Sequence, residues 1–303
     1  EQPAGTPTSG QGASSLAVFG RNRIRILYGS SSADWDLTSY RKEVGAFPGT
    51  IQEFGSTMFL DDRGMAELKT SQRFGNFVSN TISRRIQPFI NNNKASSIAS
   101  CVARDKSQYR IFFNNKRALY VTTDNEKIVG MCPQLHAHNA SFAFSGENSE
   151  GNEEMYMGTT DGHLMQMELG TSFDGEPIEM MISTHFIHSQ SPRREKSYEE
   201  FSIEASGSGY SGFELSYELG YGSTDIPQPT YETKTLAFSK QTWDVFVWDS
   251  FFWDGQTLFP THANLDGTAE NISFLLRSSE DYYSPVALTS GILSFNWGST
   301  LRN

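Results

Sequence analysis

Short hydrophobic runs alternate with polar turns through the first half of the chain. Four pairs of runs flank a turn, at residues 16–20 and 24–29, 57–60 and 65–68, 108–113 and 118–122, and 155–158 and 163–169. Such runs, bounded by turns rich in Asn, Asp and Gly, predict β-hairpins. In the fourth hairpin the pair Asp161-Gly162 predicts a type I′ turn, which needs positive φ angles at its centre.

The hairpins recur along the chain at similar distances. Their turns are centred near residues 22, 63, 115 and 161, which gives intervals of about 41, 52 and 46 residues. A hairpin repeat of about 40–50 residues is typical of β-propeller blades. Four blades are few for a propeller, so further blades would lie before Glu1 or come from another chain. An irregular stack of antiparallel hairpins in a sandwich is the alternative.

One segment interrupts this repeat. Residues 79–86 predict a short helix, which Pro88 and the asparagine run at 91–93 are expected to end. Residues 1–15 contain few hydrophobic side chains and many Gly, Ser, Thr and Pro, and they predict a flexible tail or linker.

Longer strands follow a Gly-rich boundary near residue 170. Phe213, Leu215 and Tyr217 alternate with polar residues, which predicts a half-buried strand. Further strands are expected at 178–187, 198–205, 231–238, 272–277 and 285–297. The sequence therefore predicts an all-β chain with a tail at 1–15, propeller-like blades at 16–170 and a jelly-roll-like β-sandwich at 171–303.

Composition narrows the range of functions. The net charge is −11 and the sequence pI is about 5.0, which argues against tight binding of nucleic acid through its phosphates. Two cysteines, Cys101 and Cys132, are too few for a disulfide scaffold. No apolar run is long enough for a membrane span, and no signal peptide is recognisable. The missing initiator methionine suggests a processed chain or a segment of a longer protein.

Histidines offer weak evidence for a metal site. His136 and His138 have a spacing that would place both rings on one face of a strand, but no third ligand follows from the sequence. His185 and His188 would point to different faces. We therefore expect no metal and no cofactor.

Carboxylates offer equally weak evidence for catalysis. Asp34 and Asp36, and Asp61 and Asp62, are the closest pairs that a glycoside hydrolase would need. Both pairs fall in predicted turns, where Asp commonly bonds the local backbone. The sequence contains no nucleophile elbow, Walker loop or Cys-x-x-Cys motif. We expect no catalytic residue and no enzymatic activity.

Two segments are candidate interfaces. Within residues 243–254, Trp-Asp occurs three times, at Trp243, Trp248 and Trp253. A spacing of five places successive rings on opposite faces of a strand. An interface anchor, or a loop whose aromatic rings cover the edge of the sandwich, is therefore favoured over a flat carbohydrate-binding platform. Arg193 and Arg194 belong to a small basic cluster that would suit an acidic neighbour, or simply a solvated turn.

Several motifs, in this order, resemble virion proteins of tailed phages. They are 45–51 (GAFPGTI), 62–65 (DRGM), 74–76 (FGN), 161–162 (DG) with 169–178 (LGTSFDGEPI), 191–194 (SPRR), 248–249 and 252–254 (WD and FWD), and 271–273 with 276–278 (NIS and LRS). The order is similar to the C-terminal portion of tail nozzle, hub or tail-tube proteins of short-tailed phages.

This resemblance implies a β-propeller joined to a further β domain in a ring of about six copies. The ring would extend the DNA channel below the portal and its adaptor proteins, and would attach tail fibres or spikes. It implies assembly in the host cytoplasm and a final location in the virion tail. DNA would pass through the lumen without specific binding, and an acidic wall would prevent it from sticking.

Two other functions remain open from sequence. A carbohydrate-binding or carbohydrate-cleaving receptor-recognition protein of the tail would use the Trp-Asp segment and the turn carboxylates. A propeller acting as an intracellular interaction scaffold would stay monomeric.

Overall fold

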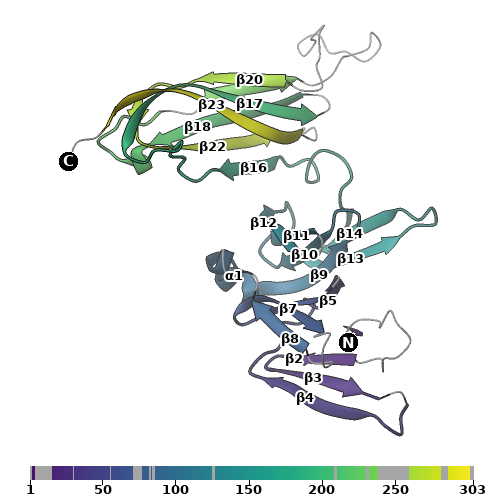
Figure 1. Cartoon of the computed structure of the whole chain (residues 1–303). Helices are drawn as coiled ribbons and strands as arrows, with labels where there is room; N and C mark the ends of the chain where they lie inside the picture. Colours follow the sequence, from purple (N-terminus) through teal and green to yellow (C-terminus); the bar gives the residue numbers. More distant parts are fainter. Residues whose placement is uncertain are drawn as a thin grey trace, which may run out of the picture. The chain divides into compact units, whose positions relative to one another are not determined.

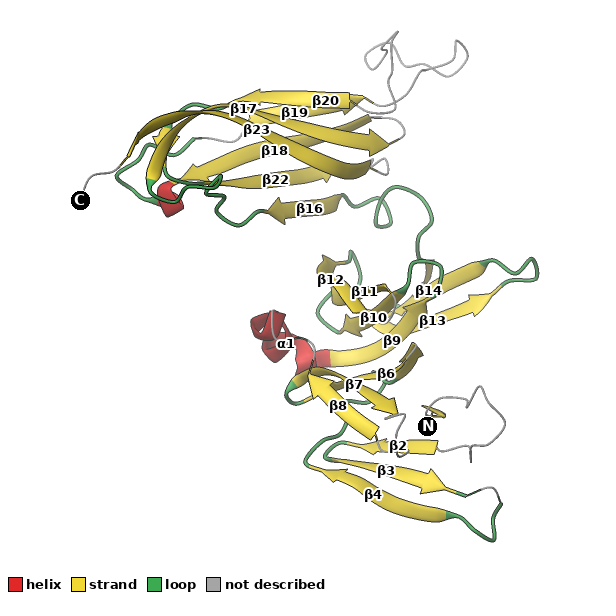
Figure 2. Cartoon of the chain, in the orientation of Figure 1, coloured by secondary structure: helices red, strands yellow, loops and turns green. Residues whose placement is uncertain are grey.

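The computed structural model describes residues 2–3, 16–29, 31–54, 56–70, 77–81, 83, 86–124, 127–207, 210–229, 232–237, 259–280 and 286–300. Antiparallel strands dominate these residues, so the predicted all-β class is confirmed (Figure 2). The chain divides into two compact units, Glu1–Leu169 and Gly170–Asn303. The predicted boundary lies next to this division. Among the described residues no helix has the length and apolar character that crossing a membrane requires.

The first unit contains four small sheets that follow one another along the chain (Figure 1). Each is a meander of antiparallel neighbours. The first has β1 (Gln2–Pro3), β2 (Leu16–Gly20), β3 (Arg23–Tyr28) and β4 (Asp36–Lys42); the second has β5 (Gln52–Phe54), β6 (Ser56–Asp61), β7 (Gly64–Thr70) and β8 (Phe77–Thr81); the third has β9 (Ser97–Ala103), β10 (Gln108–Phe113), β11 (Arg117–Asp124) and β12 (Lys127–Leu135); the fourth has β13 (Ala140–Glu147), β14 (Glu153–Thr159) and β15 (Leu164–Gln166).

These sheets pack face to face in chain order, because alternate side chains of each strand point to opposite faces. The first sheet buries Ile24 and Ile26 against Phe59 of the second. The opposite face of the second sheet, with Met58 and Leu60, packs on the third. The contact between the first and second sheets also contains Ala17, Ala66 and Leu68. The contact between the second and third sheets also contains Met65, Tyr109, Ile111, Phe113, Leu119 and Val121.

The third and fourth sheets meet through smaller side chains. Phe112 and Ala118 of the third sheet pack with Ala140 and Met157 of the fourth. Three contacts between sheets therefore leave two outer faces, one on the first sheet and one on the fourth. The first strands of successive sheets also approach each other, since β9 lies beside both β5 and β13.

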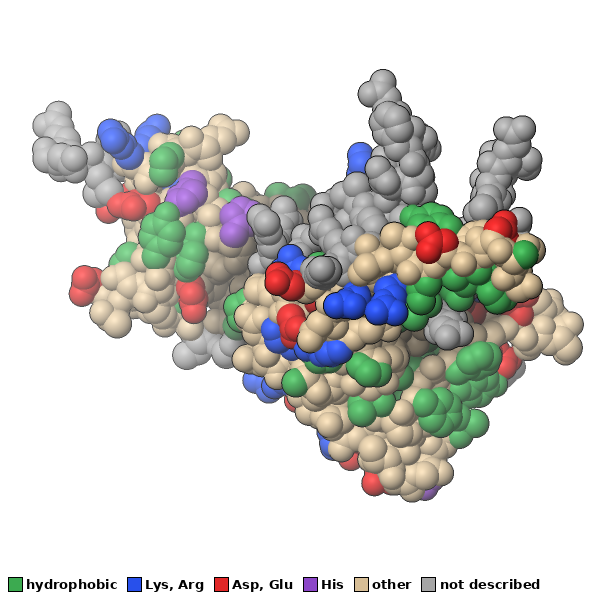
Figure 3. Space-filling model, turned by 90° about the horizontal axis from the view of Figure 1, so that it is seen from below, with side chains coloured by type: hydrophobic (Ala, Val, Ile, Leu, Met, Phe, Trp, Pro, Cys, Tyr) green, Lys and Arg blue, Asp and Glu red, His purple; other side chains and the backbone are tan. Residues whose placement is uncertain are grey.

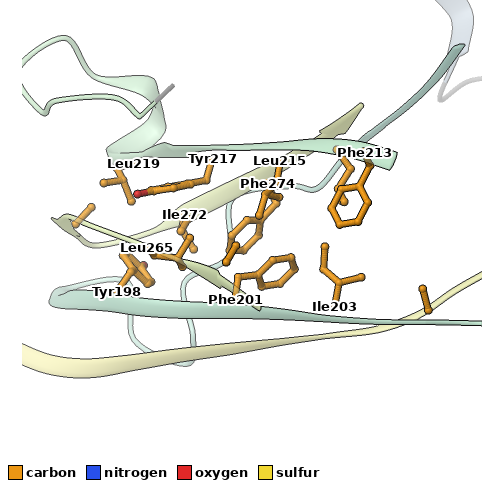
Figure 4. Packing of buried hydrophobic residues seen from close by; sticks show 14 residues of the cluster. Tyr198, Phe201, Ile203, Phe213, Leu215, Tyr217, Leu219, Leu265, Ile272 and Phe274 are labelled. Carbon is orange, nitrogen blue, oxygen red and sulfur yellow. The ribbon is translucent and has the colours of Figure 1, made fainter. Parts of the chain in front are cut away.

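The second unit has two antiparallel sheets around one core. One sheet has the order β16 (Ile178–Ser183), β22 (Ile272–Glu280), β18 (Tyr210–Leu219) and β19 (Glu232–Ala237). In the other, β17 (Arg194–Gly207) pairs with β20 (Phe259–Asn264), β21 (Thr268–Ala269) and β23 (Val286–Thr300). Figure 4 shows side chains of both sheets meeting in the core, where the Phe201 and Phe274 rings stack at 3.9 Å between centroids.

The predicted helix at 79–86 is wrong. Residues 79–81 belong to β8, which pairs with β7, and the helix α1 (Gln87–Asn93) begins later. Pro88 lies in its first turn, where a missing N–H costs nothing and the fixed φ favours helix. The proline therefore helps to begin the helix that it was expected to end. A 3₁₀ turn, η2 (Lys94–Ser96), follows α1, and another, η3 (Gly220–Gly222), follows β18.

The type I′ turn predicted at Asp161-Gly162 is also wrong. Gly162 has a φ of +85°, but Asp161 is not among the residues with positive φ. The Gly162 amide donates to the carbonyl of Thr159 at 3.2 Å, so the glycine closes a four-residue turn instead of occupying its centre. The hairpin itself is present, as β14 and β15.

Of the predicted tail at 1–15, the described residues are Gln2 and Pro3, which pair with β2 as strand β1. They are extended against the first sheet. The rest of that segment lies outside the described residues.

Candidate functional site

A polar pocket of about 330 Å³ lies where the first strands of three sheets come together. Gln52 and Glu53 reach it from β5, and Ser100 and Cys101 from β9. The other lining residues are Val102, Arg104, Ala143, Phe144 and Ser145. The strands bring these side chains together because β9 is flanked by β5 and β13.

Most polar groups of this pocket bond to the protein itself. The Ser100 hydroxyl donates to the carbonyl of Gly49 at 2.8 Å, and the Gln52 amide donates to the carbonyl of Ser100 at 2.9 Å. The Ser145 hydroxyl donates to Glu153 Oε1 at 2.7 Å, and the same carboxylate accepts the Arg104 amide at 2.9 Å. Such pairing ties the sheets together and leaves few groups to hold a ligand.

The electrostatics of the pocket do not favour catalysis. Burial raises the pKa of the Cys101 thiol to about 11, so it stays protonated and is a poor nucleophile. Burial alone would raise the pKa of Glu153, but hydrogen bonds from the Arg104 and Asp105 amides and from Ser145 outweigh it and lower that pKa. Glycoside hydrolysis needs two carboxyl groups facing one bond. Glu53 is the carboxylate among the residues that line this pocket.

The carboxylate pairs singled out in the sequence have structural partners. Asp34 accepts the Ser31 amide at 2.7 Å within its turn. Asp61 is buried and pairs with Arg63 at 3.3 Å. Asp62 pairs with Arg21, which lowers the pKa of its carboxyl. The turn interpretation therefore holds for Asp34 and Asp62, whereas Asp61 is the last residue of β6.

Asp36 likewise accepts the Thr38 hydroxyl, at 3.0 Å. Asp36 is the first residue of β4, and among the described residues the contacts of the four carboxylates give no sign of a common acid–base site.

The two histidines singled out for a metal have separate surroundings. His136 lies beside the Phe112 and Tyr120 rings, and its Nε2 is 3.3 Å from the Tyr120 hydroxyl. His138 Nδ1 is 3.8 Å from Asp161. Within the described ranges, no three His, Cys, Asp or Glu residues gather as metal ligands would.

A buried arginine lies between the third and fourth sheets, and the sequence did not predict its burial. The Arg110 side chain is 1% exposed and bonds Glu168 at 2.7 Å and Gln108 at 2.7 Å. Its guanidinium lies 4.1 Å from the centre of the Tyr120 ring. The alternation in β10 marks position 110 as facing away from Tyr109, but nothing in the sequence indicates that Glu168 would reach it.

This cluster shifts two pKa values in physically clear directions. Burial and the Arg110 charge lower the pKa of His136 to about 4, so the ring is neutral near pH 7. Burial alone would raise the pKa of Glu168, but Lys106 and Arg110 outweigh it and hold that pKa below its usual value. The cluster is a structural network of ion pairs and stacked rings, in which the buried Nη1 of Arg110 has no hydrogen-bond partner among the described residues.

One Ser, His and Glu constellation occurs in the second unit. The Ser202 hydroxyl and a Glu200 carboxylate oxygen lie 2.8 and 2.9 Å from the same nitrogen, His262 Nδ1. A hydrolase triad needs the serine and the carboxylate on opposite ring nitrogens. These three residues therefore form a surface network on β17 and β20 and not a proton relay.

The side chains of the predicted basic cluster have different surroundings. Arg193 is exposed in a turn. Arg194 donates to the carbonyl of Gly298 at 3.2 Å and lies 4.8 Å from the Trp297 ring centre. Lys196 is buried, and its Nζ donates to the carbonyls of Ser191, Arg194 and Glu270. Arg193 thus remains the outward charge of this turn. Trp243, Trp248 and Trp253 lie outside the described residues.

Comparisons with known proteins identify no family for this chain. No protein-family model and no curated protein matches the chain. Among solved structures, it is similar to a glycoside hydrolase family 43 arabinoxylan arabinofuranohydrolase from Bacillus subtilis in complex with cellotetraose. The two share 8% identity and a TM-score of 0.25, over 90% of this chain and 59% of that one. A TM-score this low carries no argument about fold or activity.

Proposed function

We propose that the chain is a structural protein of a phage tail, a nozzle or hub component of the ring-shaped channel for DNA ejection. The observation that carries this proposal is the series of four sheets packed face to face in chain order, in which the first strands of the second, third and fourth sheets meet at one pocket. Consecutive blades of a β-propeller have this arrangement. The second unit would be a jelly-roll-like sandwich joined to the blades.

The chemistry of the pocket supports a passive role. Its polar side chains bond to neighbouring strands, its thiol is held protonated, and it is lined by one carboxylate. A structural interior of this kind holds sheets in register and needs no substrate. The motifs that resemble those of nozzle and hub proteins, and their order along the chain, also support this proposal.

The proposed assembly has defined partners. About six copies would form the ring, portal and adaptor proteins would meet one end, and fibres or spikes would attach to its outside. The net charge of −11 suits a lumen through which DNA passes without binding. Arg193 and the segment with Trp243, Trp248 and Trp253 are candidate contacts to such neighbours.

Mass photometry with negative-stain imaging of the natively extracted protein tests this function. A closed ring of about six subunits with a central hole is the expected result. A monomer, or a trimer without a channel, would contradict it. In that case glycan-array binding that is lost on changing Trp243, Trp248 or Trp253 to Ala would establish the receptor-recognition alternative.

A further inference from the structure

The outer face of the fourth sheet has the composition of a protein core, but no other described sheet of the first unit packs on it. Phe142, Phe144 and Leu164 are 50%, 59% and 63% exposed. Strand register places Phe142 and Leu164 on either side of Gly158, and Phe144 beside Tyr156. Exposed apolar side chains concentrated on one small sheet mark an interaction surface.

The aromatic rings on this face are closely seated on the strands. A Cβ atom at Gly158 would lie 1.9 Å from the Phe142 ring, so the missing side chain makes room for that ring. An acid sits at the edge of the patch, because Glu154 accepts the Tyr156 hydroxyl at 2.6 Å and the Asn148 amide at 3.0 Å. The patch is therefore apolar and bordered by a negative charge.

The outer face of the first sheet has complementary chemistry. Leu16, Leu27 and Leu37 form one row across three strands, and Leu37 is 46% exposed. In the next row Arg25 stands between Val18 and Ser39 and is exposed. This end of the stack offers an aliphatic row beside a positive charge. Figure 3 shows hydrophobic side chains reaching the surface next to Lys and Arg.

We infer that the outer face of β13–β15 in one copy packs on the outer face of β2–β4 in a second copy of the chain. The inference rests on the proposed ring assembly and names its contact surfaces. The second copy is favoured because it carries an aliphatic face with Arg25 to meet Glu154, and because sheets of this chain already pack face to face three times. Contact between two different faces is head-to-tail, and such contacts generate a ring where the rotation between neighbouring copies closes.

The size of the face indicates how the contact acts. Three short strands about 4.8 Å apart cover only about 300 Å². A stable pairwise complex buries about 800 Å² per partner. This contact is therefore too small to hold neighbouring copies together by itself. It acts beside other contacts and fixes the orientation of one copy relative to the next.

Cross-linking tests the contact directly. In a Cys132→Ser background, Gln166→Cys marks the fourth sheet and Ser39→Cys marks the first, since both residues are exposed on the outer faces. A bismaleimide with a spacer of about 10 Å is expected to join copies in a mixture of the two variants and not in either variant alone. Ser183→Cys, an exposed position in β16, is the matched control for Ser39→Cys.

A charge exchange provides a second measurement. Arg25→Glu and Glu154→Arg are each expected to weaken self-association about tenfold, and the double variant is expected to regain most of that loss. Additive losses in the double variant would overturn the contact. So would cross-links from Gln166→Cys to another protein or to a segment of the same chain.

The outcome separates this inference from the proposed function. Rings in the wild-type protein without cross-links between the two faces would overturn the contact and leave the conduit function standing. Absence of rings in the wild-type protein, together with absence of cross-links between the two cysteine variants, would overturn both.

Discussion

At the scale of single residues, small side chains decide how aromatic ones lie. Gly158 is buried beneath the Phe142 ring, although its φ is not in the left-handed region. Glycine is needed at this position because a side chain would overlap the Phe142 ring, and not because of an unusual φ angle. Gly130, in β12, offers the contrast, because a Cβ atom there would meet nothing within 4 Å.

Gly158→Ala is expected to lower the free energy of unfolding by about 1 kcal/mol, because the Phe142 ring must swing away from the strand. In a Phe142→Ala background the same change is expected to stabilise, since alanine costs less conformational entropy than glycine. Chemical denaturation of the four variants measures both effects. Gly130→Ala is the matched control and is expected not to destabilise; equal losses in both backgrounds would contradict the role of the ring.

At the scale of elements, a buried network joins strands that are distant in sequence. Arg110 of β10 bonds Glu168, which follows β15, and its guanidinium lies over Tyr120 of β11. His136 lies beside the same tyrosine at the end of β12. The network holds the third and fourth sheets together and works best with neutral His136 and ionised Glu168.

Acid is therefore expected to loosen this contact between sheets. A histidine whose folded pKa is lowered from 6.5 to about 4 stabilises the fold above pH 6.5 and loses that contribution as the pH falls toward 4. Between pH 7 and pH 5 the loss is about 2 kcal/mol. Glu168, whose pKa is lowered, adds a loss in the same direction below its unfolded pKa.

His136→Gln is expected to flatten the decline in stability between pH 7 and pH 5, measured by urea denaturation at each pH. His185→Gln, at an exposed position, is the matched control and should retain the wild-type slope. If His136→Gln retains that slope too, the ring is not the titrating group.

At the scale of the whole molecule, each unit has its own core. Phe274 stacks on Phe201 in the second unit, and Phe112 packs between the third and fourth sheets of the first. Both Phe274 and Phe112 are fully buried. Separate cores predict two unfolding transitions.

Phe274→Ala is expected to cost about 3–5 kcal/mol and to lower the transition of the second unit only. Phe112→Ala is its counterpart and is expected to lower only the transition of the first unit. Differential scanning calorimetry measures the transitions, and hydrogen exchange assigns each to its unit. A single transition lowered equally by both changes would contradict independent cores.

Sequence pattern alone determined one hairpin in each sheet of the first unit and most of the long strands of the second. Alternation correctly predicted the hairpins of the first unit and the strand with Phe213, Leu215 and Tyr217, because an extended chain places every second residue on the same face. It also correctly placed Asp34 and Asp62 in turns.

Only the tertiary structure decided which faces meet. Arg110 and Glu168, 58 positions apart by their numbers, form a buried pair that no local pattern encodes. Pro88 begins a helix because β8 takes the preceding residues into a sheet. The pocket and the two uncovered faces depend on the order in which sheets pack. Such features depend on contacts between distant residues, whereas local sequence constrains only the backbone and the side-chain alternation.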